Sequence, residues 1–422
     1  MRVVWNDTEV LDHKSISLPS SKSLSHRAII TASLADGESC LKGIAMSRDI
    51  EATIQVMEKA GASFRYEGED MFVCGNGGKQ VYDGTVLDCG ESGSTIRFLI
   101  PFFTLGEKKA IFTGHGRLME RPQTVYEELF CDRGLLFEKD DDRFCVQGPL
   151  KGGKYEVRGD ISSQFISGLL FAFPLCQEDS AITILPPFES ESYVGLTLQA
   201  LERAGIHIER KGYTYFVPGR QKYCPFVERV EGDDSQMAFF AELALLNHKE
   251  IYVKNVNPHS IQGDHVIVDL MRAFGGKVVE DGDGYWFSKE AIRGIHADLS
   301  DCPDLGPALF ALATCAKGDS VFTGCRRLRM KESDRIAAME EELRKLGCSI
   351  HSDEDTVYIQ GNTQLRHNVV LSGHNDHRIV MALSMLTTRS KGCVMEGVEA
   401  VEKSYPRFFE DLAALGVTGE MQ

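Results

Sequence analysis

Basic side chains recur at the starts of segments with a helical pattern, where they could bind an anion. Lys22 and Arg27 follow a serine-rich loop, and Lys331 and Arg335 lie in a Lys-Glu-Ser-Asp-Arg segment. Acidic residues are the usual choice in a first helical turn, because the helix dipole and free N–H groups favour negative charge there. Bases at these positions therefore indicate an anionic ligand. The bases concerned are Lys22, Arg27, Arg97, Arg117, Arg121, Lys331, Arg335, Arg378, Lys403 and Arg407.

Two carboxylates, Asp304 and Glu332, lie beside these bases. Acidic residues at helix starts ordinarily cap the helix or complement its dipole. Among so many cations they also suit proton transfer. The addition of an alcohol across an enol needs a base for the hydroxyl proton and an acid for the methylene carbon. Two anionic substrates could be held by separate groups of Lys and Arg side chains. The two carboxylates would then be available as the base and the acid.

Metal- and nucleotide-binding motifs are absent from the sequence. The histidines show no HExxH spacing, and the cysteines form no CxxC pair. The segment from Gly75 to Gln80 lacks the spacing and the Ser or Thr of a P-loop, so we interpret it as a turn. His377, which stands among the cations, is interpreted as structural. We therefore expect no metal and no cofactor.

Charge and apolar content limit the possible partners. The net charge of −16 over 422 residues argues against nucleic acids and anionic membranes. The longest apolar stretch, Phe165 to Cys176, is interrupted and too short to span a membrane. Residues 1–10 lack the apolar region of a signal peptide, and scattered cysteines are typical of reduced cytoplasmic proteins. We predict a cytoplasmic monomer that acts on small molecules.

The elements that must position these residues recur along the chain. Six helical segments each end at a glycine followed by a short extended run, and these glycines lie about 70 residues apart. Glycine after a helix is the usual left-handed stop. Each repeat opens with a loop of Ser, Asp or Asn, whose side chains can cap a helix. We therefore predict six β-α-β-α-β-β units. The glycines are Gly61, Gly134, Gly205, Gly275, Gly347 and Gly416.

Six such units predict an α/β protein of two similar domains with three units each. One domain is expected over residues 21–230, and the other over residues 1–20 plus 231–422. The sixth unit ends at Gln422, short of its final strands. We expect an amino-terminal strand from Arg2 to Val10 to complete it, so that the chain crosses between domains near residues 20 and 230.

Short motifs along the whole chain resemble a known family. They are Leu18 to Ala28, Gly90 to Arg97, Arg117 to Pro122, Ser162 to Phe165, Cys302 to Asp304, Arg329 to Arg335, Asn375 to Arg378 and Lys403 to Pro406. In this order they resemble the signature segments of the 5-enolpyruvylshikimate-3-phosphate synthases. One tetrapeptide would be a weak match, whereas the ordered set is specific.

The resemblance implies the enolpyruvyl transferase fold of inverted α/β units, with a ligand cleft between the two domains. It implies transfer of the enolpyruvyl group of phosphoenolpyruvate to the 5-hydroxyl of shikimate-3-phosphate, without a metal. In that mechanism Asp304 takes the hydroxyl proton, and Glu332 or Lys22 handles the proton at the methylene carbon. A tetrahedral adduct then collapses with loss of phosphate.

The resemblance also implies which residues bind each substrate. The implied shikimate-3-phosphate contacts are Lys22, Ser23, Arg27, Ser162, Ser163, Gln164, Ser190, Tyr193, Asp304 and Lys331. The implied phosphoenolpyruvate contacts are Lys22, Gly93, Arg117, Gln164, Arg335, Arg378 and Lys403. Family members are inhibited by glyphosate at the donor position, and Gly93 would leave room for it.

Several residues depart from the family pattern. Ser20 stands where Gly is common, Glu91-Ser92 where Asn-Ala is common, and Arg327 where an Asn often contacts shikimate-3-phosphate. The alternative is enolpyruvyl transfer to UDP-N-acetylglucosamine by the sister family, which usually has a reactive cysteine in the loop at Gly114 to Arg117. No cysteine lies there. A non-catalytic repeat scaffold would leave the basic helix starts unexplained.

Overall fold

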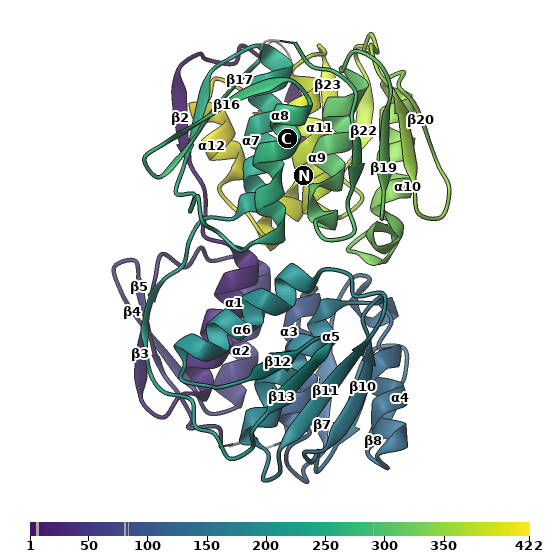
Figure 1. The fold of residues 1–422 in the computed structure, drawn as a ribbon. Coiled ribbons are helices and arrows are strands. Elements are labelled where there is room, and N and C mark those ends of the chain that lie inside the picture. Colours follow the sequence, from purple (N-terminus) through teal and green to yellow (C-terminus); the bar gives the residue numbers. More distant parts are fainter. Residues whose placement is uncertain (6–7, 80–81, 83, 290) are drawn as a thin grey trace. The chain divides into compact units, whose positions relative to one another are not determined.

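The structure is a computed structural model that describes residues 1–5, 8–79, 82, 84–289 and 291–422. The chain forms two compact units (Figure 1). The continuous unit is Ser20–Val230, and the discontinuous unit combines Met1–Pro19 with Glu231–Gln422. Residues 6–7 of the expected first strand and Gln80 of the expected turn lie outside the described residues. Among the described residues, no helix combines the length and the apolar character needed to cross a membrane.

The predicted repeat is confirmed as six four-stranded sheets built on one plan. The first strand runs parallel to the second, as in the pair Lys154–Arg158 and Ser180–Leu185. In five of the sheets the other two strands form an antiparallel hairpin beside the second, as in the third repeat. In the sixth sheet they are an antiparallel pair from the two ends of the chain, Arg2–Trp5 and Glu420–Met421. The strand orders are β14-β3-β5-β4, β6-β7-β9-β8, β10-β11-β13-β12, β16-β17-β15-β2, β18-β19-β21-β20 and β22-β23-β1-β24.

Each unit contains the helices of three repeats. In the continuous unit these are α1 (Lys22–Leu34), α2 (Arg48–Lys59), α3 (Gly93–Phe103), α4 (Thr124–Asp132), α5 (Ser163–Ala172) and α6 (Glu191–Arg203). In the discontinuous unit they are α7 (Asp234–Asn247), α8 (Ile267–Ala273), α9 (Gly306–Thr314), α10 (Arg335–Lys345), α11 (His377–Thr387) and α12 (Phe408–Ala414). Short 3-10 helices are η1 (Leu118–Glu120), η2 (Phe173–Leu175), η3 (Gly263–Val266), η4 (Pro303–Leu305), η5 (Arg326–Met330) and η6 (Val398–Lys403).

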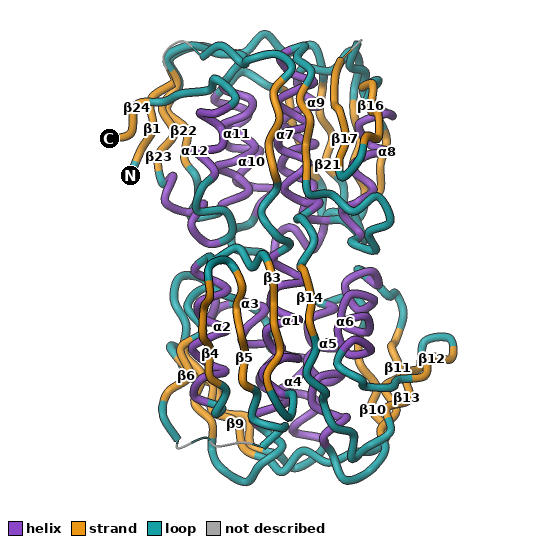
Figure 2. Tube along the Cα trace, turned by 90° about the vertical axis from the view of Figure 1, so that its left-hand side faces the viewer, coloured by secondary structure: helices purple, strands orange, loops and turns teal. Residues whose placement is uncertain are grey.

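The strands are short and lie on the outer side of the helices, as the sheet in front of α1 and α2 illustrates (Figure 2). Those of the continuous unit are β3 (Glu38–Lys42), β4 (Ser63–Glu67), β5 (Asp70–Cys74), β6 (Val86–Asp88), β7 (Ala110–Thr113), β8 (Leu136–Lys139), β9 (Arg143–Gln147), β10 (Lys154–Arg158), β11 (Ser180–Leu185), β12 (Glu209–Lys211), β13 (Thr214–Val217) and β14 (Val227–Arg229). Those of the discontinuous unit are β1 (Arg2–Trp5), β2 (Lys14–Ser17), β15 (Ile251–Lys254), β16 (Gly276–Asp281), β17 (Gly284–Lys289), β18 (His296–Asp298), β19 (Ser320–Thr323), β20 (Ser349–Ser352), β21 (Val357–Gln360), β22 (Val370–Ser372), β23 (Cys393–Glu396) and β24 (Glu420–Met421).

Three sheets include a strand from a distant part of the chain. β1 lies antiparallel to β23, beside the short carboxy-terminal strand β24. β2 runs parallel to β15 and supplies the first strand of the fourth repeat. β14 runs parallel to β3 and supplies the first strand of the first repeat. The segments before each crossing between units are therefore strands of a sheet rather than linkers.

The glycines and caps that mark the repeats have the expected local geometry. All six glycines have positive φ, from 66° at Gly134 to 98° at Gly61. Serine or aspartate side chains accept a hydrogen bond from the first turn of five repeat-opening helices. The prediction that a side chain from Asp301 to Asp304 caps the following helix is wrong. There η4 leads into α9, and no side chain caps it, because the Asp304 carboxylate binds cations instead.

The first helices of the three repeats pack together within each unit and form its core. In the discontinuous unit α7, α9 and α11 contact one another, and their apolar side chains are almost fully buried. Their amino-terminal ends are therefore brought close together, which Arg378 at the start of α11 shows by donating a hydrogen bond to Ser235 at the start of α7 (3.0 Å). This convergence places the candidate site of the unit.

Candidate active site

Arg335 is the centre of a buried charge network in the discontinuous unit. It is the first residue of α10, and its side chain is only 1% exposed. The guanidinium donates to Asp304 Oδ1 at 2.8 Å, to Glu332 Oε2 at 2.7 Å and to Asp376 Oδ2 at 2.9 Å. The planar fork of arginine suits several carboxylates at once. One side chain thus fixes the positions of three acids.

The Asp304 carboxylate pairs with three basic side chains. Besides Arg335, Lys331 Nζ lies 3.1 Å from Oδ1, and Arg378 Nη2 lies 3.0 Å from Oδ2. Burial by itself would raise the pKa of Asp304, but Arg378, Lys331 and Arg335 outweigh burial and hold that pKa well below its ordinary value. The carboxylate is therefore ionised at neutral pH and retains 17% side-chain exposure. It is available to accept a proton.

Lys403 and Lys331 supply further positive charge in this unit. Lys403 lies at the end of η6, is buried, and donates to the Asn375 carbonyl at 2.6 Å. Burial lowers the pKa of Lys331, whereas the Asp304 carboxylate opposes that effect. Arg327, one of the departures from the family pattern, is buried near Lys331 and adds to its electrostatic environment.

A second group lies at the starts of α3 and α5 in the continuous unit. Gln164 accepts from Arg97 Nη1 at 2.9 Å and donates to Ser94 Oγ at 3.0 Å. Arg97 also donates to the Pro122 carbonyl at 2.9 Å, which ties the loop after η1 to the same place. A Cβ on Gly93 would lie 2.8 Å from Arg121 Nη1 and 3.7 Å from Gln164 Oε1. Gly93, Gln164 and Arg121 are thus close neighbours.

The structure separates the two arginines of the Arg117 to Pro122 segment. Arg117 has a 47% exposed side chain and pairs with Glu120 at 3.6 Å. Arg121 is 8% exposed and reaches Gly93. The set implied for phosphoenolpyruvate contains Arg117 and does not contain Arg121. Both are bases at a helix start, and the sequence alone does not show which of the two side chains is buried.

Lys22 and Arg27 project from the first turns of α1. Lys22 Nζ pairs with Asp49 Oδ2 of α2 at 2.8 Å. Arg27 donates to the Ser23 and Tyr193 carbonyls at 2.7 and 2.8 Å and lies over the Phe98 ring. Burial lowers the pKa of Arg27 to about 9, and the oxygens of Thr197, Ser23 and Tyr193 that accept its hydrogen bonds are neutral. A buried guanidinium in this setting favours an anion nearby.

The serines implied to bind phosphate lie at two helix starts. Ser162 caps α5 by accepting from the Gln164 N–H at 3.3 Å, and Ser163 is the first residue of that helix. Ser190 stands before α6 with a left-handed φ of 53° and is fully buried. Helix amino termini with serine hydroxyls are suited to phosphate oxygens.

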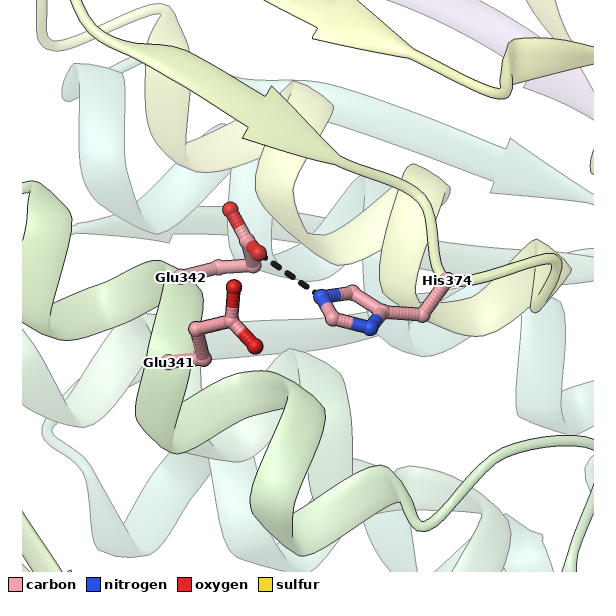
Figure 3. A group of neighbouring side chains, drawn as sticks. All are labelled: Glu341, Glu342 and His374. Atoms are coloured by element: carbon pink, nitrogen blue, oxygen red, sulfur yellow. Dashed lines mark hydrogen bonds and ion pairs between the residues drawn. The ribbon is translucent and has the colours of Figure 1, made fainter.

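The described residues contain one group with metal-ligand atoms in reach, Glu341, Glu342 and His374 (Figure 3). His374 Nε2 lies 2.7 Å from Glu342 Oε1. Lys345 Nζ lies 3.1 Å from Glu341 Oε1 and 2.8 Å from Glu342 Oε1. An ammonium on the same oxygens neutralises the charge that a cation would need. The group is therefore better described as an ion-pair network.

Comparison with known proteins gives a consistent family assignment. The family model described as EPSP synthase (3-phosphoshikimate 1-carboxyvinyltransferase) matches residues 12–412. A 3-phosphoshikimate 1-carboxyvinyltransferase of Clostridium perfringens is 38% identical and covers 95% of this chain and 96% of its own. One from Clostridium acetobutylicum is 40% identical, with coverages of 95% and 94%.

Solved structures give the same result. An EPSP synthase of Acinetobacter baumannii aligns over 100% of both chains with a TM-score of 0.82 and 25% identity. The enolpyruvyl transferase NikO of Streptomyces tendae shares the fold at 14% identity, with a TM-score of 0.79 and coverages of 99% and 98%. The α/β enolpyruvyl transferase fold expected from the motifs is thereby confirmed.

Proposed function

Because this chain belongs to the EPSP synthase (3-phosphoshikimate 1-carboxyvinyltransferase) family, we propose that it joins phosphoenolpyruvate to the 5-hydroxyl of shikimate-3-phosphate. The carboxyvinyl group is transferred and phosphate is released. The observation that carries the proposal is the network in which Asp304, an ionised carboxylate, is surrounded by Arg335, Arg378 and Lys331. Such a site offers a base together with the charge needed to hold two anionic substrates.

Asp304 is proposed as the base for the 5-hydroxyl proton. Its low pKa makes it a weak base while the surrounding cations act on it alone. Bound carboxylate and phosphate groups would share Arg335 and Arg378, so that the pKa of Asp304 rises when both substrates are in place. The base is then strongest in the complex that reacts.

The proton at the methylene carbon is assigned to Glu332 or Lys22. Glu332 is held by Arg335 at 2.7 Å, next to the base. Lys22 is a cation whose ammonium lies 2.8 Å from Asp49. Protonation of that carbon leaves a cationic centre that the 5-oxygen attacks, and the adduct collapses as the proton and phosphate leave.

Substrate contacts are proposed as follows. Ser162, Ser163 and Ser190 bind the phosphate of shikimate-3-phosphate, supported by their places at helix starts. The other acceptor contacts are Lys22, Ser23, Arg27, Gln164, Tyr193, Asp304 and Lys331. The donor contacts are Lys22, Gly93, Gln164, Arg335, Arg378 and Lys403, with Arg121 in place of Arg117 because Arg121 is buried beside Gly93.

We also propose that the two compact units are the two domains, and that the protein is a cytoplasmic monomer. The location is supported by the twelve cysteines, all within the described residues and all free thiols.

A phosphate-release assay tests the proposed function. The purified chain is incubated with phosphoenolpyruvate and either shikimate-3-phosphate or UDP-N-acetylglucosamine. We expect phosphate only with shikimate-3-phosphate. Release only with UDP-N-acetylglucosamine would favour the sister activity, and release with neither would favour the non-catalytic scaffold.

Chelation is expected to leave this activity unchanged. The charge of both substrates would be neutralised by Lys and Arg, and Lys345 occupies the oxygens of the Glu341, Glu342 and His374 group. The measurement compares rates before and after dialysis against EDTA. Activity that disappears and returns with a divalent ion would contradict the metal-free mechanism.

Gly93→Ala is expected to weaken glyphosate binding by about tenfold or more and phosphoenolpyruvate binding by less. The added Cβ would lie 2.8 Å from Arg121 Nη1, so this guanidinium must move away from the donor position. The longer inhibitor needs that space more than the natural donor does. Inhibition constants for glyphosate against phosphoenolpyruvate are measured in both proteins, and equal constants would show that Gly93 does not line the donor position.

A further inference from the structure

Glu342 is a fully buried carboxylate that the proposed reaction does not use. It lies on α10 seven residues after Arg335, which places both side chains on the same face of the helix. Oε2 accepts from the Ser372 N–H at 3.0 Å, and Oε1 from His374 Nε2 at 2.7 Å (Figure 3). Lys345 Nζ completes its partners at 2.8 and 3.0 Å. Glu342 therefore binds α10 to the segment that precedes α11.

That segment has an unusual backbone. His374 and Asn375 are consecutive non-glycine residues with φ of 47° and 52°. Left-handed conformations of such residues persist only where the surrounding contacts enforce them. One such contact is the hydrogen bond from the His374 side chain to Glu342, and another is the hydrogen bond from the Ser372 N–H to the same carboxylate.

The same segment places two groups of the proposed donor site. The Asn375 carbonyl accepts from Lys403 Nζ at 2.6 Å. Asp376 accepts from Arg335 Nε at 2.9 Å. A change in the backbone at His374 would move both acceptors, and with them the ammonium and the guanidinium that they orient.

We propose that Glu342 and His374 form a positioning pair, which holds the segment before α11 so that Lys403 and Arg335 are correctly placed for phosphoenolpyruvate. This inference rests on the proposed function. Neither residue contacts substrate in this account, and the effect passes through the Asn375 carbonyl and the Asp376 carboxylate.

The charge of His374 gives the pair a pH dependence. Its imidazole faces Glu342, Glu341 and Lys345 of α10, and the hydrogen bond that it donates to Glu342 raises the pKa of His374 above its ordinary value. A raised pKa means that the bond is strongest while His374 is protonated. It weakens as the pH rises through that pKa. Placement of Lys403 should therefore loosen toward alkaline pH.

The experiment measures kcat and both KM values between about pH 6 and pH 9, a range that starts below the ordinary pKa of histidine. His374→Leu removes the bond and is expected to raise KM for phosphoenolpyruvate about tenfold, with KM for shikimate-3-phosphate nearly unchanged. His374→Gln can still donate to Glu342 but does not titrate. It should restore most of the affinity and abolish the rise of KM with pH.

His13→Leu is the matched control. His13 also has a positive φ, 52°, and also pairs with a glutamate, Glu250 at 3.1 Å, but it holds no residue of the proposed site. It should leave all constants unchanged. Wild-type KM for phosphoenolpyruvate in His374→Leu would overturn the inference, as would equal losses for both substrates that His374→Gln does not rescue. A wild-type chain without activity would instead refute the proposed function.

Discussion

Asp304→Asn is expected to lower kcat by about a hundredfold or more, the scale of a lost general base, while shikimate-3-phosphate still binds. The amide keeps the shape of the side chain but cannot take the 5-hydroxyl proton. Arg335 and Arg378 would keep most of their positions, because Arg335 also binds Asp376 and Arg378 also binds Ser235. Turnover is measured by phosphate release and acceptor binding by calorimetry.

Asp301→Asn is the matched control, because Asp301 lies in the same loop but is exposed. It should keep wild-type turnover. Full turnover in Asp304→Asn would remove Asp304 from the mechanism. If the variant instead lost acceptor binding with kcat intact, Asp304 would be a binding residue.

Of the substitutions considered, Arg335→Met is expected to lower the stability of the folded protein most. Breaking a buried ion pair by removing one partner costs about 3–5 kcal/mol, since it leaves the other charge uncompensated. Here the loss leaves Asp304, Glu332 and Asp376 without the cation that they share. Because the discontinuous unit has about 210 residues, we expect its Tm to fall by roughly 10 °C. Thermal unfolding is followed by circular dichroism at neutral pH.

The same network predicts how stability depends on pH. The cations outweigh burial and lower the pKa values of Asp304 and Asp376 in the folded protein. A lowered carboxyl pKa contributes stability that is present above the unfolded value and is lost as the pH falls through the folded one. Arg335→Met should therefore lose more stability at neutral pH than in acid. An unchanged Tm at neutral pH would contradict this description of the network, and Arg335→Lys should give an intermediate value.

The sequence predicted the repeat because its signals are local. Glycine in the left-handed region after a helix and serine or aspartate before one leave a residue pattern wherever they occur, and six copies made the period visible. The strands β2 and β14 left no such pattern. Each is four residues or fewer, and each is defined by pairing with a strand more than a hundred residues away.

The sequence identified the cations of the candidate site better than the carboxylates that pair with them. Lys331, Arg335 and Arg378 could be recognised because bases oppose the helix dipole at a helix start. Asp376, a partner of Arg335, and Asp49, a partner of Lys22, could not be recognised, since both have ordinary positions for acids near helix starts. For Asp304 the sequence allows two roles, helix capping and proton transfer. The structure shows its carboxylate bound to three cations. These ion pairs depend on which helix starts lie close together in the fold, and the local sequence does not show this.

The most direct test of the central claim is to identify the product. The chain is incubated with shikimate-3-phosphate and phosphoenolpyruvate, and the mixture is followed by proton and phosphorus NMR. We predict vinyl protons of an enol ether on the 5-oxygen of shikimate-3-phosphate, formed in equal amount to free phosphate. Phosphate without an enol ether, or an enol ether on another oxygen, would contradict the proposed transfer.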